Sequence, residues 1–260
     1  MNFLCVSDQI DPLVYSVSAK ERYGDVDAVF CAGDLSMEYV DYIVTTLGKP
    51  TYFVFGNHNL KEYSYYSRKQ TMGITATPEK ASASGDSMKY SHGAVYASNR
   101  VLRTRKLRFK KFRDSTKKQS PLLIAGISGS VRYNNGDAQF TNSQMTIQLL
   151  KLIPKLVLNR IIYGRYLDIF LTHSPPRHIH DKEDPCHKGF ECFNWFIKRF
   201  RPALMIHGHI HLYDNIAPRE TLRGSTLIVN CFSHLVIEMN EEFNDKGERI
   251  GFTVHSVKSR

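Results

Sequence analysis

Three histidines follow an apolar run in the stretch Ala203-Leu204-Met205-Ile206-His207-Gly208-His209-Ile210-His211, and this stretch decides the fold that we expect. The apolar run is typical of a buried strand, and side chains two residues apart on an extended backbone point to the same side. His209 and His211 are therefore predicted to face one place, and Gly208 lets the chain leave the strand sharply. Neutral imidazole is a common ligand of zinc, manganese and iron. The alternative is a polar loop after a buried strand, so the ends of the other strands must be compared.

Six short apolar segments are predicted to form buried strands, because they are continuously apolar and partly β-branched or aromatic. They are residues 3–6, 28–31, 52–55, 122–125, 169–171 and 203–206. Helical periodicity separates several of them, at 37–47, from 141 onward and at 190–200. Thr141 to Gln144 is predicted as a capping box that begins the second helix, and Pro154 is predicted to end or kink that helix. This alternation of strands and helices predicts α/β layers.

The pattern changes near the end of the chain. Segments 226–229, 234–238 and 250–254 are strand-like and follow one another with no helix between them. We expect a run of antiparallel strands there, which makes the sheet system mixed.

Length and composition limit the class of protein. The chain has 260 residues and is 42% hydrophobic, so we expect one domain over residues 1–260. No run reaches about 18 consecutive apolar residues, so we expect no membrane span. The N-terminal apolar stretch has no basic region before it, so we expect no signal peptide. Five cysteines without zinc-finger spacing favour the reducing cytoplasm.

Two segments stand apart from this pattern. The net charge of +10 is concentrated in residues 99–119, which hold ten lysines and arginines against one acid, Asp114. Such a basic segment attracts nucleic acid or phosphorylated substrates, and a solvated hairpin is the alternative. Residues 62–92 are rich in small and polar residues without a strong period. We expect them to form a flexible or lid-like excursion.

Chemically active residues follow five of the six predicted core strands. They are Asp8, Asp34, Asn57 with His58, His173, and His209. Sites in open α/β sheets form beyond the carboxyl ends of strands. An isolated Asp after a strand is usually a helix N-cap, but that explanation does not cover the whole set. Carboxylates, an amide oxygen and imidazoles suit a pair of borderline divalent ions. Two such ions can clamp an in-line phosphoryl displacement in which a metal-bound hydroxide attacks phosphorus.

The order of these motifs resembles that of the calcineurin-like metallophosphoesterases. The family pattern is Asp-x-His, Gly-Asp, Gly-Asn-His-Asp/Glu, a lone His, and Gly-His-x-His. This chain supplies Ser7-Asp8-Gln9-Ile10, Gly33-Asp34, Gly56-Asn57-His58-Asn59, His173 and Gly208-His209-Ile210-His211. The resemblance implies a four-layer αββα sandwich of two mixed β-sheets flanked by helices. It also implies a metal-dependent hydrolase that cleaves a phosphoester, with a phosphodiester favoured.

The resemblance further implies which residues hold two divalent ions, drawn from Mn, Fe, Zn and Mg with Mn favoured. Asp34 would be the ligand shared by both ions. The other ligands would be Asn57, His173 and His209 for one ion, and Asp8 and His211 for the second. His58 would stabilise the phosphoryl oxygens or protonate the leaving group, as a titratable imidazole can.

Two positions depart from the family pattern. Ile10 stands where the family has the second histidine of its first motif, and its side chain cannot coordinate a metal. The site of Asp8 is therefore expected to be weaker, or adapted to Mn²⁺ or Mg²⁺. Asn59 replaces an acid and is expected to change how His58 is oriented or protonated.

Candidates for substrate binding follow two of the core strands. They are Arg132, and, after His173, Arg177, His180 and His187. Arginine can hold a phosphate bidentately, and polar loops are the alternative. Two other functions stay open at this point. One is a nuclease that binds RNA or DNA through residues 99–119, and the other is a non-catalytic scaffold on the same fold, which Ile10 suggests.

Overall fold

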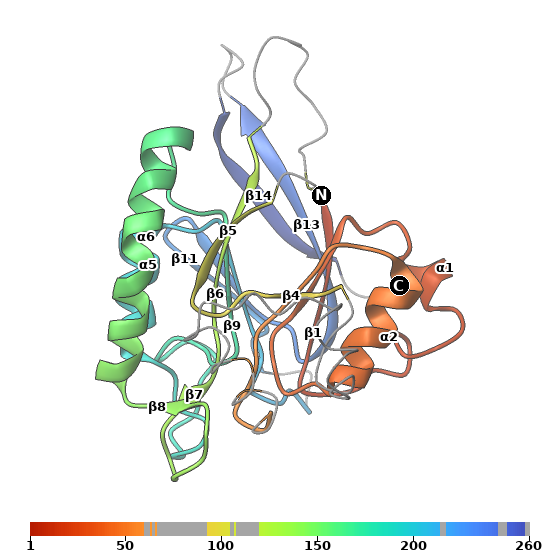
Figure 1. The fold of residues 1–260 in the computed structure, drawn as a ribbon, viewed down its shortest axis with the longest axis horizontal. Coiled ribbons are helices and arrows are strands. Elements are labelled where there is room, and N and C mark those ends of the chain that lie inside the picture. The colour runs from red at the N-terminus through yellow and green to blue at the C-terminus, as the bar shows by residue number, and fades with distance from the viewer. Residues whose placement is uncertain are drawn as a thin grey trace.

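The computed structural model describes residues 1–59, 63, 66, 93–104, 107, 120–213, 217–243 and 249–257. Within them, two six-stranded sheets lie face to face between helices (Figure 1). This is the expected four-layer arrangement of two mixed sheets flanked by helices. The predicted excursion at 62–92 and the basic segment at 99–119 lie mostly outside the described residues.

The first sheet has the strand order β14-β13-β1-β2-β3-β4. Its strands are β1 (Asn2–Ser7), β2 (Ala28–Cys31), β3 (Thr51–Phe53), β4 (Val95–Tyr96), β13 (Ser233–Phe243) and β14 (Arg249–Val257). Strands β1 to β4 are parallel, and β13 is antiparallel to β1. Side chains alternate along β1: Phe3 and Cys5 enter the core between the sheets, while Leu4 and Val6 enter the core beneath the helices. Burial on both faces explains why β1 is continuously apolar.

The second sheet has the order β11-β12-β10-β9-β6-β5. Its strands are β5 (Arg100–Thr104), β6 (Leu122–Ile127), β9 (Ile169–Thr172), β10 (Leu204–His207), β11 (Glu220–Arg223) and β12 (Thr226–Asn230). Strands β6, β9, β10 and β12 are parallel, and the edge strands β5 and β11 are antiparallel to their neighbours.

The predicted antiparallel run after residue 226 is wrong for its first strand. Strand β12 pairs in parallel with β10, whereas β13 and β14 form an antiparallel hairpin in the other sheet. The chain changes sheets between β12 and β13, where Cys231 N–H bonds to the carbonyl of His207 and Phe232 bridges to Ser7. Apolar periodicity does not encode such a crossing.

Helices cover the outer face of each sheet. Helices α1 (Ala19–Tyr23) and α2 (Met37–Leu47) pack on the first sheet, and α5 (Asn142–Tyr163) and α6 (Glu191–Phe200) on the second (Figure 1). The predicted capping box of Thr141 and Gln144 is confirmed. Helix α5 does not end at Pro154 but continues to Tyr163, with Gly164 as its cap. Burial of its apolar face, which includes Leu152 and Leu156, outweighs the cost of about 3 kcal/mol for an interior proline.

The same end of the sandwich receives the carboxyl ends of the central strands of both sheets. A small parallel pair, β7 (Ser130–Val131) and β8 (Gln139–Phe140), follows β6.

No helix among the described residues has both the length and the apolar character that a membrane span requires.

Candidate metal centre

Three residues at the strand ends have left-handed backbone conformations. The φ angles are 63° for Asp8, 53° for Asp34 and 70° for His209. Such conformations cost about 1 kcal/mol or more and cluster at functional sites. Gly208 has no positive φ. This position requires glycine for a steric reason, because a Cβ there would lie 2.4 Å from Oδ2 of Asp8. The backbone thus turns sharply at these ends, so that the side chains face one another.

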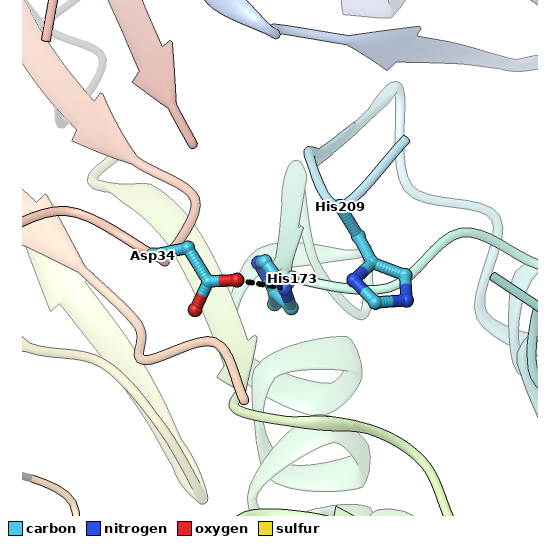
Figure 2. Close-up of side chains that lie close together, drawn as sticks. All are labelled: Asp34, His173 and His209. Atoms are coloured by element: carbon cyan, nitrogen blue, oxygen red, sulfur yellow. Dashed lines mark ion pairs between the residues drawn. The ribbon is translucent and has the colours of Figure 1, made fainter. Parts of the chain in front are cut away.

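Four of the six predicted ligands converge at one point. The ligand atoms of Asp34, His173 and His209 all lie within 4.8 Å of one another (Figure 2). Nε2 of His173 lies 3.2 Å from Oδ2 of Asp34 and 3.2 Å from Oδ1 of Asn57. Asp34 and Asn57 come from the first sheet and both histidines from the second, so this cluster joins the two sheets.

Backbone carbonyls fix the orientation of both imidazoles. Nδ1 of His173 donates to the carbonyl of Ala32 at 2.8 Å, so Nε2 is the nitrogen that faces Asp34. Nε2 of His209 donates to the carbonyl of Cys186 at 2.7 Å, which leaves Nδ1 with a lone pair. Figure 2 shows the Nδ1 side of this ring turned toward His173 and Asp34. Histidines that bind metals almost always donate their other ring N–H in this way.

Burial and mutual charge control the protonation of the cluster. Burial lowers the pKa of His209 to about 3, with a contribution from His173, so His209 is a neutral ligand. Burial also opposes the charged form of His173, but the carboxylates of Asp34 and Asp8 raise its pKa to about 9. Although burial opposes ionisation of Asp34, His173 holds the pKa of that carboxyl well below its usual range. The proton shared by Asp34 and His173 takes the position that a cation bound to both groups would take. The donor set therefore fits a divalent ion.

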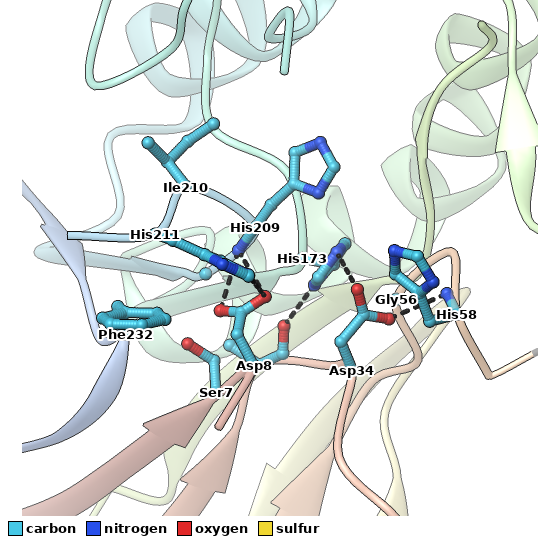
Figure 3. Close-up of polar contacts among 12 residues, drawn as sticks. Ser7, Asp8, Asp34, Gly56, His58, His173, His209, Ile210, His211 and Phe232 are labelled. Carbon is cyan, nitrogen blue, oxygen red and sulfur yellow. Dashed lines mark hydrogen bonds and ion pairs between the residues drawn. The ribbon is translucent and has the colours of Figure 1, made fainter. Parts of the chain in front are cut away.

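The second predicted site is more open. Both carboxylate oxygens of Asp8 accept the backbone N–H of His209, at 3.0 and 2.9 Å (Figure 3). Nε2 of His211 lies 4.0 Å from Oδ1 of Asp8, and the ring of His211 stacks on Phe232. Nδ1 of His211 contacts the hydroxyl of Tyr213 at 2.6 Å. The Asp8 carboxyl is buried, and burial raises its pKa, whereas the His211 side chain is 40% exposed.

The two departures from the family pattern have different surroundings. Ile10 is half exposed. Asn59 is buried, and its Oδ1 accepts the N–H groups of Asp34 and Gly56 while its Nδ2 donates to the carbonyl of Leu35. The amide therefore ties the turns after β2 and β3 together. Its expected influence on His58 stays a prediction.

His58 lies on the open side of the cluster. Its side chain is exposed, and its backbone N–H donates to Oδ1 of Asp34 at 2.9 Å (Figure 3). This bond holds the Asp34 carboxylate in place, and it leaves the imidazole of His58 accessible to a substrate.

The sequence interpretation missed Tyr133. Its hydroxyl accepts Nδ2 of Asn57 at 3.1 Å, which keeps the amide oxygen of Asn57 directed at His173. Its backbone N–H is held by Oε1 of Gln139 on β8. The one available signal was its place beside Arg132, just after a core strand.

Two predicted substrate-binding arginines have contrasting surroundings. Arg132 is exposed, and its guanidinium contacts the carbonyl of Gln139 at 3.4 Å. Arg177 forms ion pairs with Asp181 at 2.6 Å and with Glu183 at 2.7 Å. Those carboxylates raise the pKa of Arg177 and occupy the groups that a phosphate would use.

The two predicted histidines also differ. His180 uses both ring nitrogens inside the protein, on His207 and on Thr221, each at 2.9 Å. Its pKa falls to about 4, mainly through burial, so it supports the carboxyl end of strand β10 as a neutral ring. His187 lies closer to the metal cluster, with its ring centroid 5.5 Å from that of His209.

Comparison with known proteins agrees with this geometry. A family model described as calcineurin-like phosphoesterase matches residues 2–213. One solved structure is similar over 100% of this chain and 99% of its own, with a TM-score of 0.58 and 14% identity. The crystal structure of TT1561 of Thermus thermophilus is similar over the same shares, with a TM-score of 0.54 and 13% identity. At these identities the likeness establishes the fold alone. The comparison with curated proteins gives no significant match.

Proposed function

The chain belongs to the calcineurin-like phosphoesterase family, and we propose that it cleaves a phosphodiester at a centre that holds two divalent ions. The family assignment makes it a metal-dependent phosphoester hydrolase in general. The preference for a diester and the number of ions are the specific parts of this proposal.

One observation carries the proposal. The two buried imidazoles, His173 and His209, each donate one ring N–H to a backbone carbonyl, and the ligand atoms of both lie within 4.8 Å of the Asp34 carboxylate. Two lone-pair nitrogens around a buried carboxylate need a proton or a cation between them. This is the arrangement of a metal site whose ligands are oriented in advance.

Asn57, Asp34, His173 and His209 would hold one ion, and Asp8, Asp34 and His211 the other. Divalent ions in these places would lower the pKa of a bound water and neutralise charge on the phosphoryl group. The second set has fewer protein ligands because Ile10 supplies none, so we propose the weaker affinity there. Oxygen ligands and imidazole together favour Mn²⁺.

The remaining residues act on the substrate. The accessible imidazole of His58 would donate a proton to the leaving oxygen, as a positioned general acid does. Tyr133 accepts Nδ2 of Asn57 and keeps its own hydroxyl proton for a phosphoryl oxygen. Arg132 lies on the same β7–β8 segment and is exposed, so it is the arginine that we propose for phosphate binding.

Hydrolysis of bis-para-nitrophenyl phosphate and para-nitrophenyl phosphate with Mn²⁺ tests the proposal. We expect the diester to be cleaved faster, and His58→Ala to lower kcat by about 100-fold. His178→Ala is the matched control, because this histidine is 67% exposed and contacts none of the proposed ligands. A protein that cleaves neither compound, or full activity in His58→Ala, would contradict the proposal.

The other two functions have their own discriminating measurements. A scaffold would bind almost no metal when Mn²⁺ is added, whereas we expect the hydrolase to bind it. A nuclease would bind nucleic acid with an affinity that falls steeply with salt. The basic segment that suggests the nuclease lies mostly outside the described residues, so this function stays a prediction.

A further inference from the structure

A second group of metal-type side chains lies on the loop that follows β9. Oδ1 of Asp184 is 2.7 Å from Nδ1 of His187 and 3.0 Å from Sγ of Cys186. Sγ of Cys186 is 3.8 Å from the same nitrogen of His187. An ion above this triangle can lie about 2.0–2.3 Å from all three atoms, which are the usual distances for zinc.

The chemistry of the three atoms points to a particular kind of ion. A thiolate, an imidazole and a carboxylate are all ligands that zinc accepts, and thiolate excludes Mg²⁺ and Ca²⁺ as the preferred ions. We propose that Asp184, Cys186 and His187 form a separate binding site for Zn²⁺ or a similar borderline divalent ion.

The loop backbone holds these ligands together. The N–H of His187 bonds to the carbonyl of Asp184 at 3.2 Å, and the N–H of Lys182 bonds to the carbonyl of His187 at 3.1 Å. Both bonds close the turn that brings positions 184 and 187 to one side. Asp184 is exposed, and Cys186 and His187 are half-buried, so an ion can enter from solvent and keep one position for water.

The site is separate from the first centre but adjoins it. It shares no side chain with that centre, yet the carbonyl of Cys186 accepts Nε2–H of His209 at 2.7 Å. The ring of His187 also lies beside that of His209. An ion bound to Cys186 would fix this carbonyl and with it the orientation of His209. The proposal does not depend on phosphoesterase activity.

Cobalt spectroscopy on the whole protein tests the site directly. None of the ligands proposed for the first centre is a cysteine, so a thiolate-to-cobalt charge-transfer band can come only from a thiol elsewhere. We expect Co²⁺ to produce this band, Cys186→Ser to abolish it, and Asp184→Asn and His187→Ala to weaken it at least tenfold. The matched controls are Glu183→Gln and His178→Ala, since both are exposed neighbours outside the triangle.

Thiol labelling gives an independent readout. All five cysteines are described, and Cys186 is the one that is not buried. We expect Zn²⁺ to slow its reaction with a disulfide reagent at least tenfold in the native protein, and not in Asp184→Asn. Absence of the cobalt band, its persistence in Cys186→Ser, or an unchanged labelling rate with Zn²⁺ would overturn the proposal.

Discussion

Replacement of Gly56 by alanine is the sharpest perturbation of the proposed centre. Gly56 lies between β3 and Asn57, and its φ is not positive, so alanine is compatible with the local backbone. The new methyl group would instead enter the cluster. Its carbon would lie 2.0 Å from Oδ1 of Asp34 and 2.6 Å from Cε1 of His173.

The expected effect follows from these distances. Ordinary contacts begin at 3.4 Å, so the Asp34 carboxylate must retreat by about 1.4 Å, the difference from 2.0 Å. Metal ligands tolerate about 0.2 Å, and a displacement of about 1 Å in an active site costs roughly 100-fold in rate. We therefore expect Gly56→Ala to lose at least that factor in kcat/KM and to bind Mn²⁺ more weakly.

The assay is hydrolysis of bis-para-nitrophenyl phosphate together with metal content after Mn²⁺ loading. Gly48→Ala is the control, because its Cβ meets nothing within 4 Å while its φ is +61°. This control should lose about 1 kcal/mol of unfolding free energy through backbone strain and keep full activity. If Gly56→Ala keeps both its activity and its Mn²⁺ content, the placement of Asp34 in the reacting centre is wrong.

Three further predictions concern residues around the centre. Tyr133→Phe removes the acceptor for Nδ2 of Asn57, so kcat/KM should fall about tenfold with little change in melting temperature, as one lost hydrogen bond predicts; equal activity of this variant would remove Tyr133 from the site. Asn59→Asp places an oxygen against the carbonyl of Leu35, so urea unfolding should show a loss of about 1–3 kcal/mol; an unchanged midpoint would mean that the turns after β2 and β3 do not depend on this amide. Although burial opposes ionisation of Asp11, hydrogen bonds from Ser233 and His234 lower its pKa, so its stabilisation is present above pH ~4 and is lost as pH falls through the folded value. Asp11→Asn should therefore be about 1–3 kcal/mol less stable at pH 7, with a gap that narrows in acid unfolding curves; a gap that stays constant with pH would refute the charge as its cause.

The strand ends were visible in the sequence because burial on both faces makes each core strand continuously apolar. A polar residue just beyond such a strand stands out, as His173 does directly after β9 and Asp34 does three residues after the end of β2. What the sequence did not show is how the chain connects distant pieces. Strand β12 joins β10 in parallel, and the chain then crosses to the other sheet at Cys231 and Phe232, which no local pattern encodes.

Side-chain partners were less predictable than positions. Tyr133 reaches Asn57 only because the β7–β8 pair folds back toward the cluster. Arg177 is paired with Asp181 and Glu183, which lie four and six residues later in the same loop. Acidic residues so near in the sequence indicate that the charge of Arg177 is neutralised within the loop. His180 faces His207 and Thr221, and the contact with Thr221 depends on where strand β11 lies.

The central claim is that Asp34 would contribute to both of two ion sites, and that a phosphoester would bind to them at the end of the sandwich where the carboxyl ends of the strands lie. An anomalous-scattering crystal structure of the Mn²⁺-loaded protein soaked with phosphate tests it most directly. We expect one manganese peak against Asn57, His173 and His209, a second of lower occupancy against Asp8 and His211, and phosphate in contact with both. Manganese absent from Asp34, or phosphate bound away from it, would contradict the account.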